Sequence, residues 1–212
     1  MAEQRVKGED LLEKDRVYLF DSTLRDGAQT EGVDFTVADK VAISRALDET
    51  GIDYIEGGWP GANPTDNAFF ASPPPFRRAT LVGFGMTRRP GRSAHNDPGL
   101  AAILDAKPGA ACLVGKAWDF HVNVALGIEP QENLAMINES IAAAKARLGT
   151  AMFDAEHFFD GYKANPRYAL SCVETAYKAG ARWVVLCDTN GGTLPHEIEQ
   201  IVREVAHQVP GS

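Results

Sequence analysis

Cysteine is scarce in this sequence. The 212 residues include three, Cys112, Cys172 and Cys187, and no two of them form a CxxC pair. An odd number of widely spaced cysteines does not suit a disulfide framework. Cys112 and Cys187 lie within apolar runs, so we expect buried free thiols in a reducing compartment.

Long hydrophobic runs and excess positive charge are also missing. No apolar segment reaches the length that crosses a membrane, and the charged first 16 residues lack the apolar core of a signal peptide. The 21 Lys and Arg residues are outnumbered by 29 Asp and Glu, which gives a net charge of −8. No overall field therefore favours nucleic acid or an anionic membrane. We expect a cytoplasmic protein with neither partner, in which an anionic substrate needs a local basic site.

Short apolar segments alternate with helical patterns along the chain. With 44% hydrophobic and 24% charged residues, the composition is ordinary for a globular protein with a sizeable core. The first expected strand begins at Val17, and the others cover residues 52–58, 81–85, 111–115, 151–157 and 183–189. The expected helices cover 36–50, 63–71, 98–104, 118–126, 130–147, 165–179 and 195–205.

Six strand-then-helix units in series favour either a (β/α)8 barrel or a doubly wound sheet, because parallel strands need helical crossovers. The first strand is followed by Leu-Arg-Asp-Gly, which is not the glycine-rich phosphate loop typical of the second fold. We therefore predict an α/β fold of the (β/α)8 TIM-barrel type with about six of eight units present. A short extension, 1–16, precedes this partial barrel domain, 17–212.

Arg25 and Asp26 follow the first expected strand, and Gly27 allows the backbone to turn closely. Barrel active sites form where the carboxyl ends of the strands converge, so this segment is the predicted floor of such a site. On an extended or turn backbone we expect the two adjacent side chains to diverge and to serve different parts of one ligand. The alternative is a surface ion pair.

Polar residues recur at the ends of later strands. Glu56 and Glu156 are candidate site carboxylates, and the alternative for each is a structural salt bridge at the barrel rim. Thr189 is a candidate hydroxyl donor or the cap of the following turn. Lys116 could reach the site, but we expect a solvated loop lysine, and we expect His157 to be structural.

The sequence also contains five blocks that resemble, in order, the catalytic barrel of the citramalate synthases: FDSTLRDGAQTEG, GIDYIEGGWPGANPTD, VGKAWDFHV, FDAEHFFDGYKANP and VVLCDTNGGTLP. The resemblance covers about residues 17–205 and extends to 2-isopropylmalate and homocitrate synthases and to HMG-CoA lyase. It implies an acyltransferase of branched-chain amino-acid biosynthesis, including that of isoleucine. Such an enzyme condenses acetyl-CoA with a 2-oxo acid, here pyruvate to (R)-citramalate, and is a homodimer at full length.

The resemblance also implies roles for single residues. Asp26 matches a ligand of a divalent metal (Mg, Mn or Zn), and Arg25 matches the arginine that faces the carbonyl oxygen of the substrate. The implied substrate-binding residues are Arg25, Gln29, Glu56 and Thr189, and the implied catalytic residues are Arg25 and Glu156. A hard cation polarises the carbonyl, and a fixed guanidinium stabilises the alkoxide that forms. Glu156 would orient a water or move a proton, and Thr189 would donate to the substrate carboxylate.

One motif of the family is absent. The metal in this family is also held by two histidines of an HxH motif on the seventh strand, whereas His95, His121, His157, His196 and His207 form no HxH here. We therefore expect a truncated barrel with an incomplete metal site, inactive or nearly so on its own. Its two open strand edges favour self-association, unless the sequence is part of a longer gene. Two alternatives remain: a related lyase or aldolase, and a non-catalytic remnant.

Overall fold

One parallel sheet organises the molecule. The computed structural model describes residues 16–209, so the expected N-terminal extension lies almost entirely outside the described residues. The six strands are β1 (Phe20–Asp21), β2 (Tyr54–Gly58), β3 (Thr80–Met86), β4 (Ala110–Lys116), β5 (Ala151–Glu156) and β6 (Trp183–Leu186). They pair in the order β1-β2-β3-β4-β5-β6, and every pair is parallel. This arrangement confirms the predicted series of six parallel strand–helix units.

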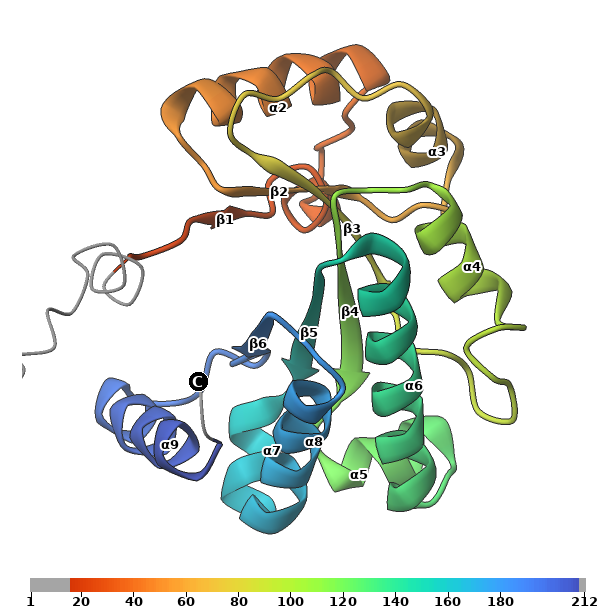
Figure 1. The fold of residues 1–212 in the computed structure, drawn as a ribbon. Helices are drawn as coiled ribbons and strands as arrows, with labels where there is room; N and C mark the ends of the chain where they lie inside the picture. The colour runs from red at the N-terminus through yellow and green to blue at the C-terminus, as the bar shows by residue number, and fades with distance from the viewer. Residues whose placement is uncertain (1–15, 210–212) are drawn as a thin grey trace, which may run out of the picture.

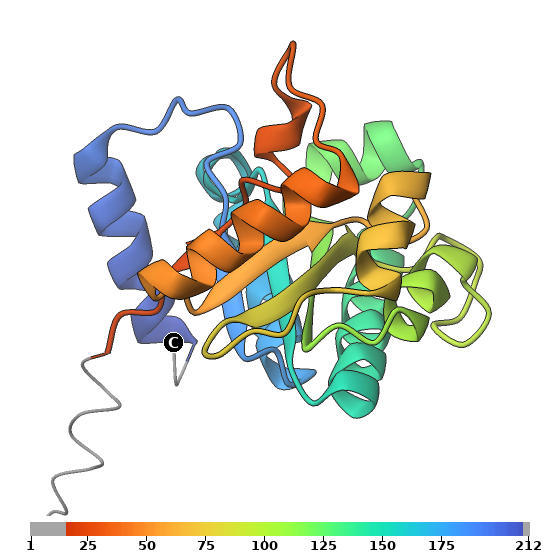
Figure 2. The ribbon, with the colours of Figure 1, turned by 90° about the horizontal axis from the view of Figure 1, so that it is seen from above.

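The helices lie on the outer side of the curled sheet, which forms a half-barrel (Figures 1 and 2). They are α2 (Val37–Thr50), α3 (Pro64–Ala71), α4 (Pro98–Asp105), α5 (Asp119–His121), α6 (Pro130–Leu148), α7 (Phe158–Ala164), α8 (Pro166–Lys178) and α9 (Pro195–Gln208). A 3-10 turn, η1 (Gly27–Gln29), follows β1, and a π-helical turn, η2 (Val122–Leu126), follows α5. No described helix combines the length and the hydropathy needed to cross a bilayer.

Local capping explains why the predicted helices begin and end where they do. Thr36 and Asp39 form a reciprocal capping box at the start of α2, and Gly51 ends this helix with φ of 93°. Asn63 and Asp97 accept hydrogen bonds from the first turns of α3 and α4.

Some boundaries differ from the prediction. β1 has only two residues, and β6 ends at Leu186, because the chain turns into the loops that carry the site residues. α7 was not predicted: the segment between the expected strand 151–157 and the expected helix 165–179 forms a short helix that buries Phe158, Phe159 and Gly161. The expected helix 118–126 is divided, with a π-helical second half.

The alternation of side chains along each strand separates two environments. On β5, Ala151, Phe153 and Ala155 pack outward among the helices, whereas Met152 and Asp154 face the concave side. A cavity of about 450 Å³ opens on this concave side between the edge strands β1 and β6. Its lining residues include Tyr18, Phe20, Tyr54, Asp154, Trp183 and Val185.

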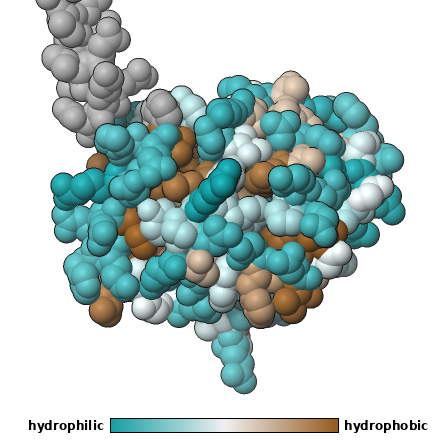
Figure 3. Space-filling view, turned by 90° about the horizontal axis from the view of Figure 1, so that it is seen from below, coloured by the Kyte–Doolittle hydropathy of each residue, from teal (hydrophilic) through white to brown (hydrophobic). Residues whose placement is uncertain are grey.

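The carboxyl ends of the strands form a mainly polar face. Figure 3 views the molecule from below, the side toward which β4 and β5 point in Figure 1. Hydrophilic side chains cover most of this face, and hydrophobic ones form separate patches between them. The predicted site residues follow the strands at this end.

Candidate active site

A compact turn after β1 sets the position of Arg25. The backbone N–H groups of Arg25, Asp26 and Gly27 all donate to the carbonyl oxygen of Ser22, at 3.1, 2.8 and 3.1 Å. The Arg25 guanidinium then lies 3.9 Å from the centre of the Phe84 ring. This stacking holds one face of the guanidinium against an apolar, quadrupolar surface.

Arg25 pairs with two carboxylates at once. Its Nε donates to Glu56 Oε2 at 2.7 Å, and its Nη1 donates to Asp26 Oδ1 at 3.0 Å. The expectation that Arg25 and Asp26 diverge is wrong, because Asp26 adopts helical φ and ψ and the turn brings both side chains to one side. The Asp26 side chain remains 62% exposed.

Glu56 is the buried partner of this arrangement. Its side chain has no solvent exposure, and among the described residues no donor reaches Oε1. Burial raises the pKa of Glu56 to about 7, against the lowering effect of the Arg25 charge and hydrogen bond. Glu56 does form the salt bridge named as its alternative role, but inside the half-barrel and not at an exposed rim.

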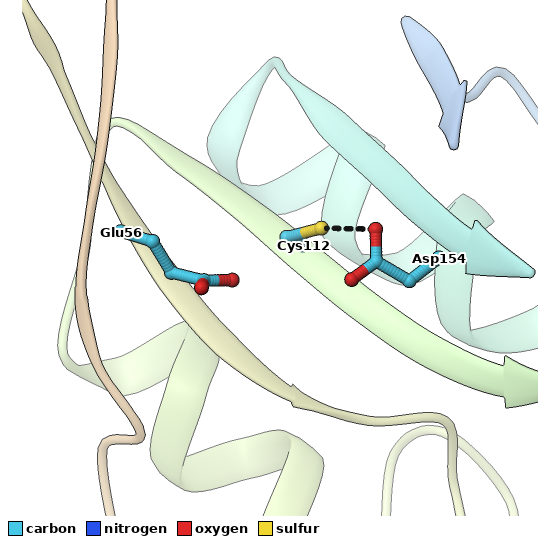
Figure 4. Close-up of side chains that lie close together, drawn as sticks. All are labelled: Glu56, Cys112 and Asp154. Atoms are coloured by element: carbon cyan, nitrogen blue, oxygen red, sulfur yellow. Dashed lines mark hydrogen bonds between the residues drawn. The ribbon is translucent and has the colours of Figure 1, made fainter. Parts of the chain in front are cut away.

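Cys112 and Asp154 lie beside Glu56 on the concave side, from β4 and β5 (Figure 4). The Cys112 thiol donates to Asp154 Oδ1 at 3.1 Å. Burial raises the pKa of both groups, and each carboxylate raises it further for the thiol. Cys112 was predicted to be a buried thiol, and the structure confirms this. Its partnership with Glu56 and Asp154 was not predicted.

Glu156 ends β5 and forms an ion pair with Lys116 at the end of β4. The two residues are opposite each other in the parallel register of these strands. The Lys116 side chain is only 17% exposed, so the interpretation of Lys116 as a solvated loop lysine is wrong. A one-residue extension of β4 beyond the predicted Gly115 places it beside Glu156.

Thr189 connects the loop after β6 to the end of β5. Its Oγ1 accepts a hydrogen bond from the backbone N–H of His157 at 2.9 Å. His157 has φ of 55°, a left-handed conformation uncommon for a residue other than glycine. Its ring lies 4.5 Å from the His121 ring, and His121 in turn packs against Trp118 at 4.8 Å between ring centres. Burial lowers the pKa of His121.

Gln29 lies in η1 and lines a second cavity, of about 370 Å³, together with Arg25 and Lys40. Sequence reasoning missed Lys40, which is 3% exposed. Its Nζ donates to the Leu24 and Gly57 carbonyl oxygens, each at 2.9 Å, and to Asp66 Oδ1 at 2.5 Å. We call these contacts the Lys40 clamp. Its one signal in the sequence is a lysine on the apolar face of the predicted helix 36–50.

The structure brings the predicted residues together in three separate sets. Arg25, Asp26 and Glu56 form one connected group, whereas Glu156 is paired with Lys116 and Thr189 with His157. Asp154 lies between the groups, since charges from both Arg25 and Glu156 act on it. In the described part of the chain, the one cluster of three potential metal ligands is Glu56, Cys112 and Asp154, and Asp26 does not belong to it.

Comparisons with known proteins agree with this architecture. The (R)-citramalate synthase of Aquifex aeolicus is 52% identical over 193 residues, which cover 90% of this chain and 37% of that protein. The (R)-citramalate synthase of Streptomyces coelicolor is 52% identical over 194 residues, covering 90% and 36%. A 2-isopropylmalate synthase of Rhodopseudomonas palustris is 31% identical over 203 residues, covering 94% and 37%. The chain thus spans little more than a third of the length of these relatives.

Solved structures of the same fold include hydroxymethylglutaryl-CoA lyase from Pseudomonas aeruginosa, with a TM-score of 0.73 and 21% identity over 92% of this chain and 65% of that one. The HMG-CoA lyase from Brucella melitensis has a TM-score of 0.69 and 17% identity over 92% and 70%. These structures support the TIM-barrel type of the half-barrel. A family model described as HMGL-like matches residues 16–212. The chain therefore belongs to the HMGL-like family.

Proposed function

We propose that residues 17–212 form the part of a barrel domain that binds and polarises a 2-oxo acid in a synthase using acetyl-CoA. The proposed product is (R)-citramalate, as the names of the relatives at about 52% identity suggest, and the proposed acceptor is pyruvate, as the sequence resemblance implies. The observation that supports this most is the Arg25 guanidinium, which is held by Glu56 and Phe84 at the carboxyl end of β1. A rigid cation at this place suits an oxygen that gains negative charge.

Arg25 acts on the oxygen of the acceptor carbonyl. When the carbon nucleophile derived from acetyl-CoA attacks, the C–C bond forms and the carbonyl oxygen becomes an alkoxide. Nε and Nη1 of Arg25 are used by Glu56 and Asp26, and within residues 16–209 no acceptor is bound by Nη2. The Arg25 guanidinium therefore has N–H groups left to donate to substrate oxygens. Because its orientation is fixed, it needs no reorganisation during the reaction.

The other predicted residues have separate roles in this proposal. Thr189 accepts from the His157 N–H through a lone pair, so its own O–H remains able to donate to the substrate carboxylate. Glu156 moves a proton or orients a water beside Lys116. Gln29 contributes its amide from the wall of the cavity next to Arg25. Because Glu56 is fully buried, it acts through Arg25 by fixing the guanidinium.

Asp26 is the proposed carboxylate ligand of a divalent metal, which would supply Lewis-acid polarisation of the carbonyl. Among the described residues, Asp26 belongs to no group of three potential metal ligands. A single exposed carboxylate does not fit a metal site by itself, so every step above is carried by Arg25, Thr189 and Glu156.

Ligand binding by the purified chain tests the proposal. In ligand-observed NMR, pyruvate should bind the chain, and Arg25→Ala should abolish binding while the circular dichroism spectrum is unchanged. Arg45→Ala, which alters an exposed arginine on α2, is the matched control and should bind normally. Unchanged pyruvate affinity in Arg25→Ala would overturn the proposal.

Product analysis separates the alternatives. Because the chain alone is expected to be inactive, the assay uses a full-length protein that contains this segment: formation of citramalate from acetyl-CoA and pyruvate supports the synthase, and release of acetyl-CoA from 3-hydroxy-3-methylglutaryl-CoA supports a lyase. Binding of neither substrate, with the fold intact, would support a non-catalytic protein.

A further inference from the structure

Three side chains of different chemistry meet inside the half-barrel. Glu56 of β2, Cys112 of β4 and Asp154 of β5 all face the concave side, and their potential ligand atoms lie within 4.8 Å of one another. Cys112 is fully buried and Asp154 is half-buried. Figure 4 shows the Glu56 carboxylate and the Asp154 carboxylate on opposite sides of the Cys112 sulfur. The three side chains come together because all three residues lie on the same face of one sheet.

Glu56 supplies an independent sign that this cluster binds a ligand. Its Oε2 is satisfied by Arg25, but Oε1 has no donor among the described residues although the whole side chain is buried. Buried carboxylate oxygens without a hydrogen-bond partner are rare in native proteins. They indicate a catalytic role, a bound ion or a bound water. In Figure 4 this carboxylate points toward Cys112, so a ligand that satisfies Oε1 would also contact the thiol and Asp154.

The balance of charge indicates a cation. Arg25 is the positive group that pairs with Glu56 and also acts on Asp154. With both carboxylates ionised and the thiol converted to thiolate, the cluster carries three negative charges against the single positive charge of Arg25. A divalent cation brings the sum of these four groups to zero, which is the condition that a buried site with several charges must approach. Asp26 also pairs with Arg25, but its side chain is 62% exposed and its charge is screened by solvent.

The donor set selects the kind of cation. One sulfur and two carboxylate oxygens suit a borderline-soft ion such as Zn²⁺, whereas Mg²⁺ and Ca²⁺ take oxygen ligands. The Cys112 sulfur and Asp154 Oδ1 are 3.1 Å apart. Two ligands on one tetrahedral zinc ion are roughly 3.5 Å apart, so this pair needs little adjustment. The cavity lined by Arg25, Met152 and Asp154 gives the ion a path from solvent.

We propose that Glu56, Cys112 and Asp154 form a binding site for a thiophilic divalent cation of the Zn²⁺ type. Glu56 Oε1, the Cys112 thiolate and an Asp154 oxygen are three ligands, and a water from the cavity is the fourth. Glu56 keeps its Oε2 hydrogen bond to Arg25, so the ion and the guanidinium share one carboxylate. Formation of the metal–sulfur bond breaks the S–H bond of Cys112 and releases its proton to solvent.

Titration of the purified chain with Co²⁺ tests this site, because Co²⁺ replaces Zn²⁺ and gives a thiolate-to-metal charge-transfer band. One equivalent of Co²⁺ should produce the band, and added Zn²⁺ should remove the band by displacing the Co²⁺. Cys112→Ser keeps the size of the side chain and should lose the band. Cys172→Ser is the matched control, since Cys172 is equally buried but lies on α8 outside the cluster, and it should keep the band.

Glu56→Gln provides a second readout with the thiol intact. Loss of even an outer-shell partner weakens a metal site by roughly 10–100-fold, so this variant should weaken Co²⁺ binding by at least about tenfold. Circular dichroism of each variant reports whether it folds, and the wild-type titration stands without any variant. No charge-transfer band in the wild type at stoichiometric Co²⁺, or a band that survives Cys112→Ser, would overturn the proposal.

Discussion

Arg25 Nε and Glu56 Oε2 lie 2.7 Å apart, and this ion pair joins the loop after β1 to the interior of the half-barrel. The carboxylate is completely buried and the guanidinium side chain is 17% exposed. Arg25 therefore has a fixed orientation on its buried side and free donors on its outer side. The proposed chemistry and the proposed cation site both depend on Glu56, one through each carboxylate oxygen.

Replacement of Glu56 by alanine should destabilise the fold. The change leaves Arg25 without its buried partner, and removing one member of a buried ion pair costs about 3 kcal/mol or more. Chemical denaturation should show this loss in the free energy of unfolding. Glu174→Ala is the control, because Glu174 forms an exposed pair with Lys178 on α8 and should cost less than about 1 kcal/mol. Equal costs for the two variants would contradict the structural role of Glu56.

A methyl group at Gly58 should disrupt the Lys40 clamp. Gly58 has φ of 145°, and a Cβ there would lie 2.5 Å from the Asp66 carboxyl carbon. Gly58→Ala therefore combines backbone strain with a clash, and we expect a loss of about 3 kcal/mol in the free energy of unfolding. Gly192→Ala is the control, since its Cβ would meet no atom within 4 Å. A stable Gly58→Ala protein with an unchanged melting temperature would contradict this geometry.

Much of the fold could be predicted from sequence because its signals are local. The capping box of Thr36 and Asp39 lies within four consecutive residues, and Gly51 supplies the left-handed end of the same helix. The order of the parallel strands then follows from the crossover helices. The short β1 and the unpredicted α7 depend instead on how the loops at the carboxyl ends of the strands pack, which no local pattern records.

The site could be predicted only in part, for a related reason. Arg25 and Glu56 were identified through their positions at strand ends, but their direct contact spans 31 residues of sequence. The partnership of Cys112 with Asp154 spans 42 residues and depends on the register of β4 and β5. The pairing of Arg25 with Asp26 was predicted wrongly because the turn geometry after β1 could not be derived from the residue types.

Asp48 should make stability sensitive to acid. Its carboxylate accepts backbone N–H groups from Arg77, Arg78 and Ala79 at 2.7, 2.9 and 2.7 Å. These hydrogen bonds, that of Arg77 first, lower the pKa of Asp48 below its usual value of 3.8. A lowered pKa in the folded state stabilises the protein above the unfolded pKa, and this contribution is lost as pH falls through the folded pKa.

The free energy of unfolding should therefore decline as pH falls below about 4. Asp48→Asn should reduce that decline, because the amide cannot be protonated in this range and the carboxylate that the backbone stabilises is gone. Urea denaturation of both proteins between pH 5 and pH 2 measures the difference. An equal acid dependence in wild type and Asp48→Asn would contradict the role assigned to these hydrogen bonds.

Variants of Thr189 can separate its proposed contact with the pyruvate carboxylate from its structural contact with the His157 N–H. Thr189→Val removes both the acceptor for the His157 N–H and the O–H proposed to bind the pyruvate carboxylate. A hydrogen bond to a charged group contributes about 1.5 kcal/mol or more, so pyruvate affinity should fall about tenfold. Thr189→Ser retains the hydroxyl and should restore both stability and affinity. If Thr189 only fixes the loop after β6, Thr189→Val will lower the melting temperature while the pyruvate affinity of the folded protein stays unchanged.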